Sequence, residues 1–313
     1  MQKIIAVVGP TASGKTSLSI ALARHFGGEI LSADSMQIYS EMSIGTAKPS
    51  IKERCGVPHH LMGHVSVEKN YNVAAYTEDA RAVLNDMKSR DVLPIICGGT
   101  GLYIDHLLGN TDFFDIPIRE DIREMYQAMA LEKGNRFVFD LLKERDPELA
   151  QRLHPNDSKR VIRGLEVLDI TGEKLSVIQK KSHRESPFRV LYLGLDFNDR
   201  SKLYERIDLR VDLMMKQGLL DEVHNLLNNY DLSDTARGAI GYKELFASVR
   251  SGESVDAAVD LIKQRSRNYA KRQLTWFRRN TETHWLYRDV LPEDALVDQA
   301  ILLCEDFLKG ENT

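Results

Sequence analysis

The sequence predicts an α/β protein in which helices flank a parallel sheet and an all-helical segment interrupts the sheet. Short apolar runs alternate with stretches of helical spacing from residue 4 to 97, and this β-α-β-α-β order is typical of a doubly wound parallel sheet. A strand signal is absent between about 112 and 187 and returns at 190–197. We therefore expect core at 1–112, a helical insertion at 113–187, and further core with basic C-terminal helices at 188–313.

The first predicted strand leads into a phosphate-binding loop. Residues 4–16 read IIAVVGPTASGKT, which contains G-x-x-x-x-G-K-T between a strand and a helix. Glycines allow torsions that turn successive N–H groups toward one anion, Lys15 adds charge for the outer phosphates, and the Thr16 hydroxyl can ligate Mg²⁺. This context favours a P-loop NTPase-like core over a chance glycine-rich turn. The predicted phosphate or diphosphate ligands are Gly9, Thr11, Ala12, Ser13, Gly14, Lys15 and Thr16.

Asp34 closes the second predicted strand, EILSAD at 29–34. Ligands of open parallel sheets collect at the carboxyl ends of the strands, so Asp34 is a candidate base beside the phosphate loop. The alternative is an aspartate that only caps a turn. His59 and His60 follow a proline without other metal-ligand residue types at suitable spacing, and we expect them to be solvated or core histidines.

A helix at 73–90 and a strand at 93–97 complete the first half of the sheet. An enzyme that hydrolyses nucleotides usually ends such a strand with an acid that holds Mg²⁺ through water, whereas Cys97 stands here before two glycines. This difference counts against ATP hydrolysis, although Asp196, at the end of the later strand, is an alternative acid.

The predicted insertion is rich in charges of both signs. Within it, the side chains of Asn156, Asp157 and Ser158 can cap a helix that ends before Gly172. The basic residues of its first turns suit phosphate contacts or a solvated helix face. These residues are Lys159, Arg160 and Arg163.

The core resumes with a strand at 190–197 and a helix that presents an apolar stripe as far as Gly218. Arg206 and Arg210 lie one turn apart on that helix, where they can bind a diphosphate or form surface ion pairs. A glycine-interrupted basic loop is expected at 236–245, a long basic helix at 255–279, and an edge strand at 285–290. Basic and aromatic residues interleave on the long helix, which favours a nucleic-acid contact, although some of its cations must simply face solvent.

Composition limits the classes of function. The chain of 313 residues has a formal net charge of −4, which argues against a generally cationic nucleic-acid coat, so any such contact requires segregated charge. Its three scattered cysteines argue against disulfides and zinc. Without a membrane-spanning apolar run or a cleavable signal, we expect a cytoplasmic enzyme with no membrane association, and no obligate protein partner is evident.

Several segments in one order are similar to a known family. They are GPTASGKT, SADSMQIYSEMSIGTAKP, GGTGLY, HPNDSKRVIRGLEV, GAIGYKEL and KRQLTWFR. Together they resemble the tRNA dimethylallyltransferases, also called tRNA isopentenyltransferases, of the bacterial type. The resemblance covers nearly the whole length.

The resemblance implies transfer of a dimethylallyl group from dimethylallyl diphosphate to the N6 amine of the adenosine 3′-adjacent to the anticodon in tRNA, with Mg²⁺ as cofactor. The phosphate loop would then hold the isoprenoid diphosphate instead of ATP. By position, Asp34 would be the catalytic base, while Lys15, Thr100 and Arg210 would serve the leaving diphosphate, with Arg206 as the alternative arginine. The implied tRNA contacts are Asp34, Ser35, Met36, Gln37, Thr100, Arg123, Lys159, Arg160, Val161, Ile162, Arg163, Arg237, Gly241, Tyr242 and Lys243.

The sequence departs from the family at Ser40-Glu41, where relatives often carry a basic residue and glycine, so the loop after Asp34 is expected to differ. It also lacks the C-terminal zinc-finger segment of eukaryotic relatives. Alternative functions are a P-loop nucleoside or nucleotide kinase, an adenylate isopentenyltransferase acting on free nucleotides, and a noncatalytic RNA-binding protein with a nucleotide switch.

Overall fold

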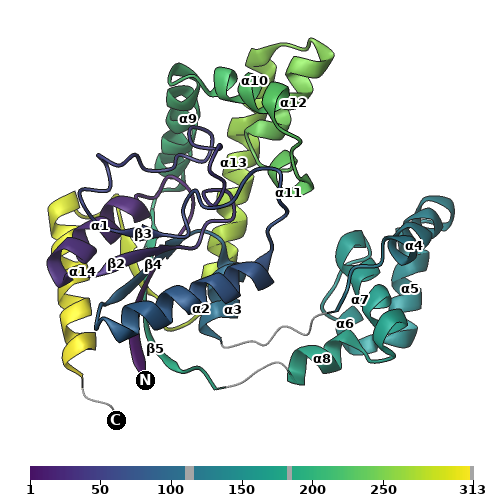
Figure 1. Cartoon of the computed structure of the whole chain (residues 1–313), viewed down its shortest axis with the longest axis horizontal. Coiled ribbons are helices and arrows are strands. Elements are labelled where there is room, and N and C mark those ends of the chain that lie inside the picture. Colours follow the sequence, from purple (N-terminus) through teal and green to yellow (C-terminus); the bar gives the residue numbers. More distant parts are fainter. Residues whose placement is uncertain (110–115, 182–184, 311–313) are drawn as a thin grey trace. The chain divides into compact units, whose positions relative to one another are not determined.

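The structure is a computed structural model that describes residues 1–109, 116–181 and 185–310. The chain forms two compact units (Figure 1). One comprises Met1–Leu108 and Ser186–Thr313, and the other comprises Gly109–Glu185. The sequence-based boundaries are 112/113, which lies outside the described residues, and 187/188. Each unit is considered separately below.

The first unit is built on a six-stranded sheet in which every neighbouring pair is parallel. The strands are β1 (Gln2–Val8), β2 (Glu29–Ser32), β3 (His59–His60), β4 (Pro94–Gly98), β5 (Phe188–Asp196) and β6 (His284–Tyr287). Their order across the sheet is β3-β2-β4-β1-β5-β6, which puts β1 at an interior position. The carboxyl ends of β1, β2 and β4 therefore lie at the same edge of the sheet.

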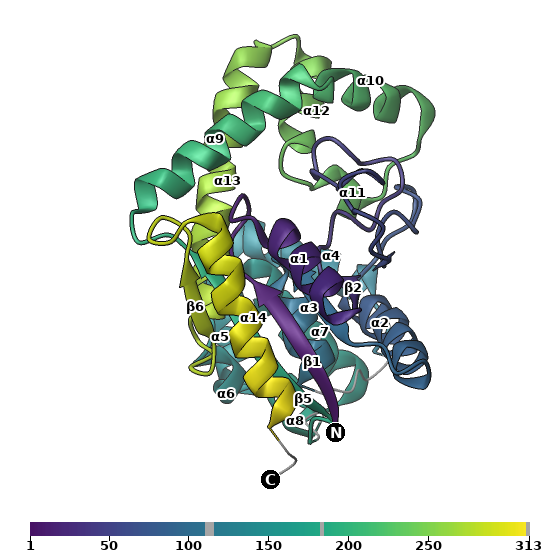
Figure 2. The same cartoon turned by 90° about the vertical axis from the view of Figure 1, so that its left-hand side faces the viewer.

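Both faces of the sheet are covered, because β1 alternates its side chains between two apolar clusters. Ile4 and Val8 pack with α2 (Val73–Ser89) and α3 (Gly101–Leu108) on one face. Ile5 and Val7 pack with α1 (Lys15–Phe26) and α14 (Glu293–Lys309) on the other. The resulting three layers can be followed in Figure 2.

Five further helices of this unit lie beyond the carboxyl ends of the strands (Figure 1). They are α9 (Arg200–Lys216), α10 (Leu219–Asn229), α11 (Asp234–Arg237), α12 (Tyr242–Ser251) and α13 (Val255–Phe277). Ion pairs join α13 to α9, with Lys263 Nζ 2.6 Å from Asp212 Oδ1 and an Arg267 nitrogen 2.5 Å from Asp208 Oδ1. These ion pairs hold α9 and α13 together beyond the sheet edge that carries the phosphate loop.

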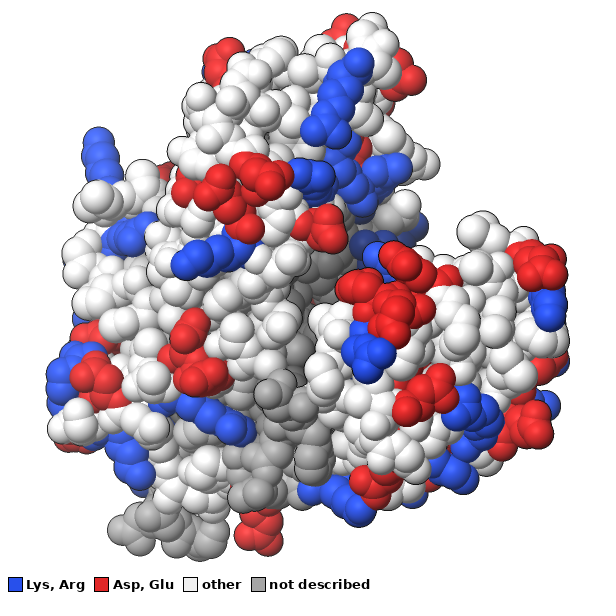
Figure 3. All heavy atoms as spheres, turned by 45° about the vertical axis from the view of Figure 1, so that its right-hand side comes forward, with Lys and Arg blue, Asp and Glu red and all other residues white. Residues whose placement is uncertain are grey.

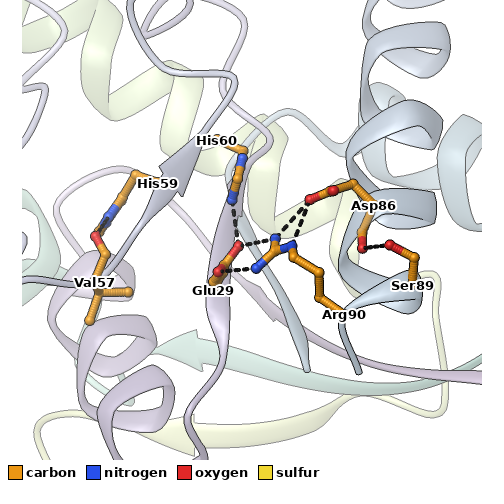
Figure 4. A network of polar contacts seen from close by, with 7 residues as sticks. All are labelled: Glu29, Val57, His59, His60, Asp86, Ser89 and Arg90. Atoms are coloured by element: carbon orange, nitrogen blue, oxygen red, sulfur yellow. Dashed lines mark hydrogen bonds and ion pairs between the residues drawn. The ribbon is translucent and has the colours of Figure 1, made fainter. Parts of the chain in front are cut away.

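Strand β3 at the sheet edge was not predicted, because a two-residue His-His strand has no period to detect. His60 Nε2 lies 2.8 Å from Glu29 Oε2, and Glu29 also accepts two hydrogen bonds from Arg90 at 2.7 and 2.8 Å. Asp86 binds the same guanidinium (Figure 4). These partners lower the pKa of Glu29 to about 2, the Arg90 hydrogen bonds being the largest cause. The network ties β3, β2 and the end of α2 together.

Helices joined by short loops, without a strand, make up residues 116–181, the described part of the second unit. Its helices are α4 (Glu120–Lys133), α5 (Asn135–Arg145), α6 (Pro147–Ala150), α7 (Ser158–Thr171) and α8 (Leu175–Lys181). Their apolar residues form one core that includes Leu142 and Leu165. Glu166 is fully buried beside it and accepts hydrogen bonds from Arg163 Nη1 at 2.8 Å, Arg123 Nε at 3.1 Å and the Arg119 amide at 2.9 Å.

Most predicted elements are present within a few residues of the expected bounds, including the edge strand and the long basic helix. The loop predicted at 236–245 is wrong, because α11 ends and α12 begins inside it and only 238–241 connects them. Asp157 stands at the N-cap of α7, but the cap interaction expected from its side chain is not found among the described residues.

Charges of both signs intermingle on the face seen in Figure 3. Three cations of the basic helix α13 bind acids of neighbouring helices: Lys263 and Arg267 pair with α9, and Arg265 pairs with Glu244 at 2.6 Å. These three cations therefore have partners within the chain, and the nucleic-acid contact expected for this helix stays a prediction. None of the helices in the described ranges is long and apolar enough to cross a membrane.

Candidate active site

The phosphate loop connects β1 to α1 as the motif predicts. Gly9 and Gly14 have φ angles of +142° and +87°, which explains the requirement for glycine at both positions. At Gly9 a Cβ atom would also lie 2.6 Å from the Leu195 carbonyl oxygen. Helix α1 begins at Lys15, so its first-turn amides and its positive dipole end face the loop. This arrangement is suited to bind an anion.

Three cations lie close to this loop. The Lys15 Nζ donates a 2.6 Å hydrogen bond to the Pro10 carbonyl, and burial lowers the pKa of Lys15 to about 8. From α9, Arg206 Nε donates to the Ala12 carbonyl at 3.1 Å, and Arg210 Nη1 donates to Thr11 Oγ1 at 3.4 Å. Burial also lowers the pKa of Arg210. These positive charges lie close together and are partly buried, which favours binding of an anionic ligand such as a diphosphate.

Asp34 lies two residues beyond β2. One of its carboxylate oxygens caps the following turn, and the other is available to a substrate. Its Oδ1 accepts hydrogen bonds from the Met36 and Gln37 amides at 2.9 and 3.2 Å. Its Oδ2 accepts no hydrogen bond from the described residues, and Asp34 lines a cavity. Thr100 supports the same turn, because its Oγ1 accepts from the Ser35 amide at 3.0 Å. The cap therefore orients the carboxylate while leaving one oxygen for a substrate.

The segment after the Asp34 turn is anchored by acids. Glu222 on α10 accepts from the amides of residues 43–45 at 2.9 to 3.1 Å and from the Tyr242 hydroxyl at 2.5 Å. The Tyr242 ring is fully buried against Gly45. Glu41, one of the two residues that depart from the family pattern, accepts from the Val67 amide at 3.0 Å. This segment thus forms a fixed wall of the site.

A cavity of about 360 Å³ lies between the phosphate loop, the Asp34 turn, α9, the 238–241 connection and α13. This volume is within the usual range for small-molecule sites. Polar residues at its lining include Thr11, Asp34, Arg210, Tyr269 and Arg272. The apolar lining residues include Met36, Ile207, Val211, Met214, Leu219 and Ile262. The cavity therefore offers a charged region and an apolar region to one ligand.

Cys97 and Asp196 offer no free acid at the sheet edge for the Mg²⁺-binding role in nucleotide hydrolysis: Cys97 stands where such an acid is usual, and Asp196 is the alternative acid. Cys97 is at the end of β4, and burial raises the pKa of its thiol, so it remains neutral at pH 7. Asp196 is buried at the end of β5, where Oδ2 lies 2.7 Å from an Arg278 nitrogen and Oδ1 accepts from the Phe197 amide at 2.8 Å. The sheet edge accordingly differs from that of a nucleotide hydrolase.

The structure brings many predicted residues of this unit to the cavity. Its lining includes these nine: Thr11, Ala12, Asp34, Ser35, Met36, Arg210, Gly241, Tyr242 and Lys243. By contrast, the Gln37 side chain donates to the Thr46 and Ala47 carbonyls at 3.1 and 3.2 Å, so it supports the wall. Arg237 pairs with Asp231 at the surface at 2.9 Å.

The predicted tRNA residues of the helical unit differ in exposure. Val161 and Ile162 are 1% and 6% exposed and belong to its apolar core, so their side chains are not available to tRNA. Arg123 and Arg163 bind the buried Glu166. Arg160 is 68% exposed, and its nearest acid, Asp157, is 3.6 Å away. Of these residues, Arg160 has the least structural role.

Sequence reasoning missed several residues of the site. Tyr269 and Arg272 line the cavity, and Gln273 binds the phosphate loop. Arg272 and Gln273 lie in the segment KRQLTWFR, so a signal for them existed. Glu222 had no such signal, because its partners are about 180 residues away.

The family profile described as "IPP transferase" matches residues 37–280. The chain belongs to the IPP transferase family. A tRNA dimethylallyltransferase of Alkaliphilus oremlandii is 45% identical over 285 residues, or 91% of each chain. One from Acetivibrio thermocellus is 43% identical over 299 residues, or 95% of each chain.

Solved structures of this family agree with the fold. A tRNA isopentenylpyrophosphate transferase from Bacillus halodurans has a TM-score of 0.73 and 36% identity, with 97% of this chain and 96% of that chain covered. A eukaryotic dimethylallyltransferase acting on tRNA has a TM-score of 0.84 and 28% identity, with 100% of this chain and 81% of that chain covered. The predicted family and α/β fold are thereby confirmed.

Proposed function

We propose that this enzyme transfers the dimethylallyl group of dimethylallyl diphosphate to N6 of the adenosine 3′-adjacent to the anticodon in tRNA, releasing diphosphate. One observation carries the proposal for the site: Asp34, Arg210 and the phosphate-loop residue Thr11 line the same partly apolar cavity. A prenyl diphosphate has an anionic and an apolar end, which match the two regions of that lining. The names of the relatives support the same reaction.

Asp34 acts on the nucleophile in this proposal. The adenine amine is weakly nucleophilic because its lone pair is delocalised into the ring. As the N6–C1 bond forms and the C1–O bond breaks, Asp34 Oδ2 accepts the N6 proton and the diphosphate departs with the electron pair. A positioned base of this kind typically contributes about 10²–10⁴-fold to the rate. The turn amides that bind Oδ1 keep the other oxygen directed to the substrate.

The leaving diphosphate is stabilised by groups that already face the phosphate loop. Lys15, Arg210 and the α1 N-terminus would offset the charge that develops on the bridging oxygen. Arg210, which lines the cavity, is the principal arginine, and Arg206 assists from α9, where it binds the Ala12 carbonyl of the loop. Thr100 contributes by holding the Asp34 turn.

Mg²⁺ fits this donor set through the Thr16 hydroxyl, diphosphate oxygens and water. Within the described residues there is no group of three or more His, Cys, Asp or Glu side chains that could hold a metal. Mg²⁺ commonly binds with few protein ligands beside substrate phosphates. The bound ion would supply additional positive charge for the diphosphate.

The tRNA would contact both units. We propose contacts at Lys159, Arg160 and Lys243, and at Arg123, Arg163 and Arg237, which also pair with carboxylates of the chain. The target adenosine must leave the stacked anticodon loop to reach Asp34, at a cost of a few kcal/mol. A cytoplasmic location remains the prediction.

The direct test combines purified protein, Mg²⁺ and labelled dimethylallyl diphosphate with an unmodified tRNA that has adenosine next to the anticodon. Nucleoside mass analysis should detect N6-dimethylallyladenosine, and Lys15→Ala should abolish it. A tRNA with guanosine at that position is the matched control and should remain unmodified. Transfer to free AMP, or ATP consumption with a nucleoside acceptor, would replace the proposal with one of the alternatives.

A further inference from the structure

Gln273 on α13 connects two parts of the site that sequence motifs treat separately. The residue is 5% exposed, and both ends of its side-chain amide are hydrogen-bonded. Gln273 Oε1 accepts from the Thr11 amide at 2.8 Å, and Nε2 donates to the Gly99 carbonyl at 2.9 Å. One side chain thereby joins the phosphate loop to the turn after β4.

Each partner of Gln273 leads to a different half of the reaction. Thr11 carries the hydroxyl that accepts from Arg210, on the leaving-group side. Gly99 precedes Thr100, which accepts from the Ser35 amide in the Asp34 turn, on the base side. The amide therefore lies between the leaving-group half and the nucleophile half of the site.

Close packing of α13 explains why two positions of the segment GGTGLY are glycine. A Cβ atom on Gly99 would lie 2.1 Å from Gln273 Nε2, and one on Gly101 would lie 2.1 Å from Trp276 Cδ1. Gln273 and Trp276 are three residues apart and so share a helix face. The segments GGTGLY and KRQLTWFR meet at this contact.

We infer that Gln273 is a positioning residue that sets the spacing between the phosphate loop and the Asp34 turn. This inference rests on the proposed prenyl transfer for its kinetic consequence, but not for the contact itself. Gln273 acts through Thr11 and Gly99 and does not touch the reacting atoms. Small errors in placing two reactants cost large factors in rate, because the catalytic geometry is what the site provides.

The first test uses Gln273→Met, which keeps the side-chain volume and removes both hydrogen bonds. Gln264→Met is the matched control, since Gln264 is exposed on the same helix. With enzyme in excess, single-turnover rate constants do not depend on the folded fraction. Gln273→Met should lower this rate constant at saturating substrates by at least about tenfold. The dissociation constants for dimethylallyl diphosphate and tRNA should each change less than about threefold, since Gln273 is not among the residues that line the cavity.

A second variant, Gln273→Glu, gives a pH signature. The carboxylate accepts from the Thr11 amide but repels the Gly99 carbonyl, whereas the protonated acid can make both hydrogen bonds. The ratio of variant to wild-type rate should therefore rise as pH falls from 8 to 5.5. Dividing by the wild-type rate removes the pH effects that the two enzymes share. A ratio that does not change with pH would overturn the inference.

Hydrogen exchange tests the contact without the reaction. The Thr11 amide should exchange at least about tenfold faster in Gln273→Met than in the Gln264→Met control, because it loses its acceptor. Unchanged protection of Thr11, or an unchanged transfer rate, would overturn the inference. If the wild-type protein transfers no prenyl group, the proposed function fails, and the exchange measurement still decides whether Gln273 fixes the loop.

Discussion

Lys15 makes diphosphate binding dependent on pH in a range where most lysines stay charged. Burial lowers its pKa to about 8, with Arg210 adding repulsion and Asp34 opposing it. A diphosphate next to Lys15 favours the ammonium form and raises the pKa again, so binding above pH 8 requires uptake of a proton. Affinity should be constant below pH 8 and should fall as pH rises above it.

The size of the effect follows from this pKa. At pH 9 about one Lys15 in ten is protonated in the free enzyme, so dimethylallyl diphosphate should bind about tenfold more weakly than at pH 7. That factor corresponds to about 1.4 kcal/mol. The ligand itself stays ionised over this range, because phosphate ester protons dissociate near pH 6.

Calorimetric titration of dimethylallyl diphosphate at pH 7 to 9.5, without tRNA, measures this dependence. Lys15→Arg is the matched variant, because an arginine remains charged throughout and its affinity should be independent of pH. A flat affinity in the wild-type enzyme, or an equal slope in Lys15→Arg, would refute the reasoning. The same pKa shift predicts that the ligand-free protein gains stability from pH 8 toward 10.5, where the unfolded chain retains the proton longer.

Three further predictions concern stability and tRNA binding. Glu29→Gln should lower the free energy of unfolding by about 1–2 kcal/mol at pH 7 in urea unfolding, a modest loss because Arg90 is 41% exposed and solvent screens the ion pair. Because its partners lower the pKa of Glu29, the difference in stability between the variant and the wild type should vanish as pH falls from 4.5 toward 2. Glu222→Gln should lower the free energy of unfolding by about 1–3 kcal/mol. It should also speed hydrogen exchange at the amides of residues 43–45, which lose a charged acceptor. Arg160→Ala should weaken tRNA binding and reduce its salt slope by about 1 without changing the Tm, because Arg160 is mostly exposed.

Each of these variants has a control in the same unit of the chain. Asp86→Asn removes an exposed partner of the same arginine and should cost under about 0.5 kcal/mol. Asp221→Asn on α10 should leave the 43–45 amides protected. Lys133→Ala, on α4, should leave tRNA binding unchanged. Equal effects from a variant and its control would contradict the corresponding prediction.

The sequence predicted the sheet well because its central strands are long apolar runs. β1 and β5 are buried on both faces and have seven and nine residues, enough for the pattern to be unambiguous. The strand β3 was missed because two histidines at an edge have no pattern. The 236–245 region was misread since glycines can end and begin helices as well as form loops.

The sequence predicted those site residues whose contacts are with neighbours in the sequence. The phosphate loop and the Asp34 turn are formed by neighbours in sequence, so their motifs were sufficient to locate them. The roles of Glu222 and Gln273 depend on contacts across about 180 and 262 residues, which a single sequence does not encode locally. Likewise, composition identifies α13 as basic but does not reveal which acids of α9 face it.

Single-turnover prenyl transfer by Asp34→Asn tests the central claim most directly. Asparagine retains an oxygen that can accept from the Met36 and Gln37 amides, so the turn is preserved while the base is lost. The account predicts a rate about 10²–10⁴-fold below wild type, with unchanged affinity for tRNA and dimethylallyl diphosphate. A rate within about threefold of wild type would contradict the assignment of Asp34 as the base.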